Sequence, residues 1–241
     1  MALLEIRSLS KSFRGLRAVT RASFEVPENG LVALIGPNGA GKTTIFNMAA
    51  GVYAPDAGEI VFAGRRLDGL RPDQVCAAGV GRTFQVVKPF AGLSVLDNVI
   101  VGALRREHRV PAARRSALEI LEKLGLGAKR DLAASSLTLP DRKRLEVARA
   151  LATGPRLLLL DEVMAGLRPT ECDQIVAIFR ELNRAEGLTI LLIEHVMRAV
   201  MALAQRIVVL HHGEVIAQGT PDEVVRDPAV LESYLGEETE V

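Results

Sequence analysis

The feature that most constrains this chain of 241 residues is a glycine-rich segment between a short apolar run and a helical pattern. The apolar run covers residues 31–35, and the helical pattern covers residues 44–50. The segment between them reads Gly36-Pro37-Asn38-Gly39-Ala40-Gly41-Lys42-Thr43. Its spacing, G-x-x-x-x-G-K-[ST] after a strand and before a helix, predicts a loop that binds phosphate groups.

Each residue type in this segment suits a phosphate. Glycines let backbone N–H groups turn toward an anion without a side chain in the way, and the following helix presents its positive end to that anion. Lys42 is predicted to reach the β- and γ-phosphates of a nucleotide, and the Thr43 hydroxyl to bind Mg²⁺. We therefore predict that nucleotide binding involves Gly36, Asn38, Gly39, Ala40, Gly41, Lys42, Thr43 and Thr44.

A second apolar run ends in two carboxylates. Four leucines at residues 157–160 are followed directly by Asp161 and Glu162, and open α/β sheets bind ligands at the carboxyl ends of their strands. Asp161 suits holding Mg²⁺ through its water shell, whereas Glu162 suits polarising a water against the γ-phosphate. Neighbouring residues of a strand point to opposite sides, which predicts separate roles for the two acids. Together the two motifs indicate a Mg²⁺-dependent nucleoside triphosphatase.

The remaining sequence narrows this class. An Asn-Lys-x-Asp segment, with which GTPases read their base, is absent from the sequence. A small-molecule kinase stays open, although the acid pair favours hydrolysis by water. With 30 basic and 29 acidic residues the net charge is +1, so bulk attraction to nucleic acid is not expected. No apolar run approaches the roughly 18 residues of a membrane-spanning helix.

Apolar runs and helical patterns alternate along the chain, which predicts an α/β fold. Strands buried on both faces of a parallel sheet are expected at residues 31–35, 157–160, 190–193 and 207–210. Residues 173–184 are one of the helical stretches between them. Residues 3–63 predict an antiparallel sheet beside the main one, and residues 94–151 predict a helical insert in which Ser94 and Asp97 begin a helix.

Four further segments together resemble the ATP-binding-cassette (ABC) transporter ATPases. Gln85, at the end of Arg82-Thr83-Phe84-Gln85, stands where that family has its Q-loop glutamine, and His195 stands where it has its switch histidine. Residues 165–169 follow the acid pair as the family's D-loop does, and residues 137–151 match its signature segment in length. The resemblance implies a phosphate-loop fold of the ABC type, a single domain over residues 1–241. It implies a core of residues 1–88 and 152–241, with an antiparallel β subdomain, and a helical subdomain over about residues 89–151.

The resemblance also adds residues to the expected site. It implies that Phe13 stacks on the adenine ring, that Gln85 contacts Mg²⁺ or water, and that His195 bonds the γ-phosphate and orients Glu162. The expected catalytic residues are thus Glu162, His195 and Gln85, and the expected metal ligands are Thr43, Gln85 and Asp161.

The signature segment departs from the family pattern, Leu-Ser-x-Gly-Gln. This chain has Leu137-Thr138-Leu139-Pro140-Asp141. Thr138 keeps the hydroxyl, so it remains an expected nucleotide contact. Pro140 has no N–H for a phosphate, and Asp141 replaces a neutral amide with a negative charge. As the start of a helix the segment is sound, because proline suits a first turn and an acid there meets the helix dipole favourably.

Within the family, several stretches are similar to the longer ATPase subunit of branched-chain amino-acid importers. These stretches are residues 14–19, 82–85, 93–99, 165–169, 193–195 and 233–237. The resemblance implies ATP and Mg²⁺ as cofactors and a second ABC ATPase subunit, either a different chain or a second copy. It further implies two transmembrane permease subunits, an indirectly coupled solute-binding protein, no nucleic acid, and a peripheral place on the cytoplasmic face of the inner membrane. A urea or amide importer, a lipopolysaccharide exporter and a soluble non-transport ABC ATPase are the alternatives.

Overall fold

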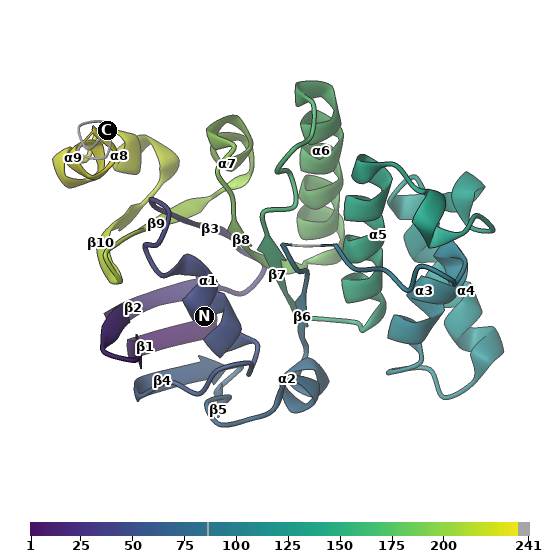
Figure 1. Cartoon of the computed structure of the whole chain (residues 1–241), viewed down its shortest axis with the longest axis horizontal. Helices are drawn as coiled ribbons and strands as arrows, with labels where there is room; N and C mark the ends of the chain where they lie inside the picture. The colour runs from purple at the N-terminus through teal and green to yellow at the C-terminus, as the bar shows by residue number, and fades with distance from the viewer. Residues whose placement is uncertain (86, 236–241) are drawn as a thin grey trace.

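The computed structural model of the chain describes residues 1–85 and 87–235. Six strands of this part form one sheet, in the spatial order β10-β9-β3-β8-β7-β6. Their bounds are β3 (Leu31–Ile35), β6 (Val80–Arg82), β7 (Leu157–Asp161), β8 (Thr189–Ile193), β9 (Arg206–His211) and β10 (Glu214–Gly219). Neighbouring strands are parallel except for β10, which forms an antiparallel hairpin with β9. Figure 1 shows this sheet in the middle of the molecule.

The central strands are apolar throughout because layers cover both of their faces. Every residue of β3, β7 and β8 is buried. Alternate residues of β3 enter separate cores: Ala33 joins the cluster shared with the helices, and Val32 joins the cluster shared with a second sheet. The predicted α/β fold with strands buried on both faces is confirmed.

The second sheet is antiparallel and covers one face of the first. Its order is β2-β1-β4-β5, with bounds β1 (Ala2–Phe13), β2 (Leu16–Pro27), β4 (Ala57–Phe62) and β5 (Arg65–Arg66). Helices α1 (Lys42–Ala49) and α2 (Pro72–Ala78) complete this layer. The antiparallel sheet expected within residues 3–63 is present, and β3, which lies in the same range, belongs to the main sheet as expected.

Helices cover the other face and extend beyond the sheet. They are α3 (Val95–Ala103), α4 (Val110–Lys123), α5 (Leu139–Ala152), α6 (Pro169–Glu186), α7 (Met197–Leu203), α8 (Pro221–Val225) and α9 (Pro228–Leu235), with the 3₁₀ turns η1 (Gly127–Lys129) and η2 (Ala134–Ser136). Ser94 begins α3 as expected, since its hydroxyl accepts the N–H of Asp97 at 3.0 Å. Helix α5 lies between α6 and the pair α3 and α4 (Figure 1). Among the helices described, none combines the length and apolar character needed to cross a bilayer.

Candidate nucleotide-binding site

The glycine-rich loop is confined by neighbouring strands. It leads from β3 to α1, and its last residue, Gly41, has φ +103°. A Cβ at Gly36 would lie 1.9 Å from the carbonyl oxygen of Leu210, and one at Gly41 would lie 2.3 Å from that of Ala18. Both positions therefore require glycine, and the loop keeps its backbone close to β9 and β2.

Lys42 points into this loop rather than into solvent. Its side chain is buried, and Nζ donates to the carbonyl oxygens of Gly36 at 2.6 Å and Pro37 at 2.8 Å. Thr43 follows it on the exposed side of the first turn of α1, where backbone N–H groups lack helical partners. A phosphate in the loop would give the ammonium group a charged acceptor, which binds more strongly than a carbonyl.

The three expected catalytic residues meet at the end of β7. The Gln85 amide donates from Nε2 to Oε2 of Glu162 at 2.7 Å, and Nε2 of His195 lies 2.9 Å from Oε1 of the same carboxylate. Glu162 lies just outside the strand with φ +48°, a left-handed conformation that costs a non-glycine residue about 1 kcal/mol or more. Asp161 and Glu162 have different surroundings, as predicted. The cause is the left-handed turn at Glu162 and not the alternation of side chains along a strand alone.

Asp161 is the last residue of β7 and is almost fully buried, with 1% exposed. Burial raises the pKa of its carboxyl group, and the guanidinium of Arg82, 3.3 Å from Oδ2, opposes that rise. Arg82 is held in turn by Asn47, whose Oδ1 accepts from it at 2.6 Å. In the part of the chain that the structure describes, Oδ1 of Asp161 has no hydrogen-bond partner.

The three expected metal ligands share one cavity. Thr43, Gln85 and Asp161 all line a cavity of about 490 Å³. Hydroxyl, amide and carboxylate oxygens are the donors that Mg²⁺ prefers, and the buried, unpaired Oδ1 of Asp161 needs a partner. The residues present therefore fit Mg²⁺.

Two charged side chains that sequence reasoning missed lie behind Glu162. Lys143 of α5 is 5% exposed, and its Nζ donates to the carbonyl oxygen of Glu162 at 2.9 Å. Glu194, 2% exposed, accepts the N–H of Met164 at 2.7 Å. Burial lowers the pKa of Lys143 and raises that of Glu194 to about 7. A lysine in a helix with several basic residues gives no sequence signal of such a contact.

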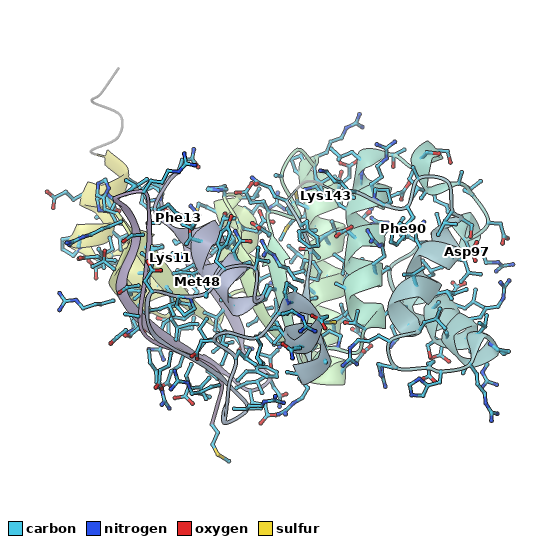
Figure 2. All side chains as sticks on the ribbon, turned by 60° about the horizontal axis from the view of Figure 1, so that its bottom comes forward. Lys11, Phe13, Met48, Phe90, Asp97 and Lys143 are labelled. Atoms are coloured by element: carbon cyan, nitrogen blue, oxygen red, sulfur yellow. The ribbon has the colours of Figure 1, made fainter. Side chains whose placement is uncertain are left out.

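Phe13 and Thr138 lie outside this cluster. Phe13 is 37% exposed and meets Tyr53 edge to face, with ring centroids 5.2 Å apart. Figure 2 shows Phe13 beside Lys11 on the side of the antiparallel sheet, well away from Lys143. Thr138 stands just before α5, and its hydroxyl donates to Oδ2 of Asp141 at 2.8 Å.

The charge of Asp141 is compensated within the chain. Asp141 is buried, and its carboxylate accepts from Nζ of Lys129, at the end of η1, at 2.5 Å. Burial disfavours the ionised form, but the hydrogen bonds from Lys129 and Thr138 outweigh it and lower the pKa of Asp141. The negative charge expected in the signature segment is thus half of an ion pair.

The main sheet is covered by an antiparallel sheet on one face and by helices on the other. With the phosphate loop and the acid pair, this arrangement defines a phosphate-loop ATPase domain of the ATP-binding-cassette class. The sequence model of the ABC transporter family matches residues 19–165, and the chain belongs to this family. A second model, described as branched-chain amino acid ATP-binding cassette transporter, matches residues 214–240. That match, like the stretch 233–237, extends past residue 235 and so partly outside the described residues.

Known proteins resemble the chain over almost its whole length. It is 41% identical to the high-affinity branched-chain amino acid transport ATP-binding protein LivG of Salmonella typhimurium, covering 98% of both chains. It is 38% identical to the lipopolysaccharide export system ATP-binding protein LptB of Acidithiobacillus ferridurans, covering 99% of both. The solved ADP conformation of an ATP-binding cassette of an ABC transporter superposes with a TM-score of 0.88 at 30% identity, covering 98% of this chain and 99% of that one.

Proposed function

We propose that this chain is the ATP-binding and ATP-hydrolysing subunit of an importer for branched-chain or other amino acids. The observation that carries the hydrolytic role is the carboxylate of Glu162, held between Gln85 and His195 directly after buried Asp161. Support for amino-acid import comes from the match at residues 214–240 and from the LivG relative.

In this proposal the residues divide the work of hydrolysis. Bound Mg²⁺, held by Thr43, Gln85 and Asp161, would neutralise phosphate charge. Lys42 binds the β- and γ-phosphates, and Glu162 orients the attacking water and takes its proton. Gln85 and His195 now occupy both oxygens of Glu162. Each oxygen keeps a second lone pair that can accept a hydrogen bond from the attacking water. His195 would bond the γ-phosphate once its own contact with Glu162 breaks.

Two ATPase subunits would complete each site. Helix α5, which begins after Thr138, stands apart from α1 and the loop before it (Figure 1), so the signature segment would be available to a nucleotide on another subunit. Each ATP would lie between one phosphate loop and the partner's signature segment, with Phe13 against the adenine ring. Because Asp141 is paired with Lys129, its negative charge does not exclude a second copy of this chain as the partner.

The permeases would dock between the core, residues 1–88 and 152–241, and the helical subdomain at about residues 89–151. A cavity of about 270 Å³ lies there, lined by Phe84, Phe90 and Val101 among others. These three side chains are 55%, 45% and 46% exposed, and exposed apolar groups in one place favour a protein partner. Docking here would put the chain on the cytoplasmic face of the inner membrane, with a solute-binding protein acting through the permeases.

Copurification tests this proposal. The tagged full chain is purified from native membranes, and the proteins that accompany it are identified. The complex is then placed in liposomes, and ATP-driven uptake of labelled leucine is compared with uptake of labelled urea. We expect integral membrane subunits and leucine uptake that a Glu162→Gln chain abolishes. Absence of any membrane partner would contradict the transporter assignment.

Lipopolysaccharide export is the second candidate, because the LptB relative is 38% identical over the same length. The same purification separates the two. Membrane partners that extract lipopolysaccharide in the presence of ATP, without solute uptake, would support export and reject import.

A further inference from the structure

Two buried charged side chains remain unused by this mechanism. Lys143 and Glu194 are 5% and 2% exposed, and both contact the backbone of the turn at residues 161–164, here called the Glu162 turn. Buried charges are costly unless they are paired and hydrogen-bonded. In the described residues, Oε2 of Glu194 has no hydrogen-bond partner, so packing stability alone does not explain these residues.

We propose that Lys143 and Glu194 are positioning residues that hold the Glu162 turn, and that Lys143 makes its geometry depend on the place of helix α5. This inference rests on the proposed role of Glu162. It assigns neither residue any contact with nucleotide, metal or water.

Three hydrogen bonds join residues 162–164 to the end of β8 and to helix α5, and the carbonyl oxygen of Glu162 also accepts the neighbouring N–H of Ala165 at 3.3 Å. The N–H of Glu162 donates to the carbonyl oxygen of Ile193 at 2.9 Å. The carbonyl oxygen of Glu162 accepts from Nζ of Lys143 at 2.9 Å. The N–H of Met164 donates to Oε1 of Glu194 at 2.7 Å. The turn is therefore held on both sides of the residue that has φ +48°, and such a conformation persists only when its surroundings enforce it.

These anchors come from two separate parts of the chain. Ile193 and Glu194 directly precede His195, so the anchors at the end of β8 and the imidazole that contacts Glu162 move together. Lys143 comes instead from α5, the helix that begins after Thr138. Figure 2 shows Lys143 between the core and the region of Phe90 and Asp97. A displacement of α5 would pull on the carbonyl group of Glu162 and so turn its side chain.

Lys143→Met tests the anchor on α5, because it keeps an unbranched side chain and removes the donor. Losing a charge-assisted hydrogen bond on the turn should lower kcat by about 10- to 100-fold. Lys143 contacts the turn at the carbonyl group of Glu162 and not at the expected metal ligand Asp161, so KM for ATP and the affinity for a fluorescent ATP analogue should stay within about twofold. Lys143→Arg keeps a cationic donor and should restore most of the turnover.

Lys123→Met is the matched control. Lys123 also joins the helical part to the core, because its Nζ lies 2.6 Å from Glu186 of α6, but that pair is exposed and makes no contact with the turn. The kcat of Lys123→Met should equal that of the unmodified chain. Glu194→Gln keeps an acceptor for the N–H of Met164 and should retain turnover, whereas Glu194→Leu should lose it. If Lys143→Met does not fold, the comparison of Glu194→Gln with Glu194→Leu still tests the proposal.

The assay uses the full chain at a concentration where turnover is measurable, with Glu162→Gln measured alongside. If Glu162→Gln hydrolyses ATP normally, the proposed function of Glu162 fails, and this inference fails with it. If Glu162→Gln is inactive while Lys143→Met and Glu194→Leu keep normal kcat, only this inference is overturned. A fall in kcat matched by an equal loss of ATP binding, or equally large in Lys123→Met, would also overturn it.

Discussion

The ion pair between Lys129 and Asp141 is expected to stabilise the start of helix α5. The Asp141 side chain is 7% exposed, whereas that of Lys129 is 42% exposed. Hydrogen bonds to charged groups contribute about 1.5–3 kcal/mol, and exposed ion pairs contribute at most about 1 kcal/mol. Because one partner is buried and the other half in water, we expect Lys129→Met to lower the free energy of unfolding by about 1–2 kcal/mol.

A double-mutant cycle measures the pair itself. Urea unfolding at pH 7 is compared for the original chain, Lys129→Met, Asp141→Asn and the double variant, and we expect a coupling free energy of about 1 kcal/mol or more. Arg198 and Asp173 serve as the control pair, since their side chains are 69% and 52% exposed. Their coupling should stay below about 0.5 kcal/mol.

The pH dependence gives a second measurement of the same pair. Folding lowers the pKa of Asp141. The ionised carboxylate therefore adds to the free energy of unfolding above the unfolded-state pKa, and this stabilisation is lost as pH falls through the folded-state pKa. The stabilities of the original chain and Lys129→Met should therefore converge in acid. A coupling no larger than that of the control pair, or a difference that persists unchanged in acid, would refute the argument that Lys129 compensates Asp141.

Three further outcomes are expected. Glu162→Gln should bind ATP but lose turnover, because the carboxylate that takes the proton is gone, as equilibrium binding and phosphate release will show. Lys42→Ala should weaken ATP binding in the same titration, because it removes the charge inside the loop. Burial raises the pKa of Glu194 from 4.5 to about 7, so the folded state binds the extra proton and stability should fall as pH rises across that window. Glu194→Gln should flatten this slope in urea unfolding measured from pH 5 to pH 8.

Much of the fold was predictable because local patterns and packing agree. The strand at residues 31–35 is apolar on both faces, and the structure buries both. The glycines at positions 36 and 41 mark a backbone that approaches its neighbours too closely for a Cβ. These features depend on residue type and spacing, which a sequence shows directly.

The contacts behind Glu162 were not predictable, because they join residues that are distant in the chain. Lys143 and Glu162 are 19 positions apart, and Met164 and Glu194 are 30 apart. A lysine that donates to a backbone carbonyl gives no pattern in the sequence, because every residue has a backbone carbonyl whatever its side chain. The left-handed conformation of Glu162 was equally hidden, because glutamate carries no preference for it.

The signature segment shows how a local argument can be sound and still incomplete. Pro140 and Asp141 suit the first turn of a helix, and α5 does begin at Leu139. Asp141 counted as a poor phosphate contact only while it was treated as an isolated charge, whereas Pro140 still offers no N–H. Lys129 lies 12 positions earlier, in a separate turn, and it contributes the cation that changes this conclusion. With a positive charge beside the start of α5, the segment presents a neutral pair together with the N-terminal helix dipole. An anion on a partner subunit would therefore meet no net repulsion there.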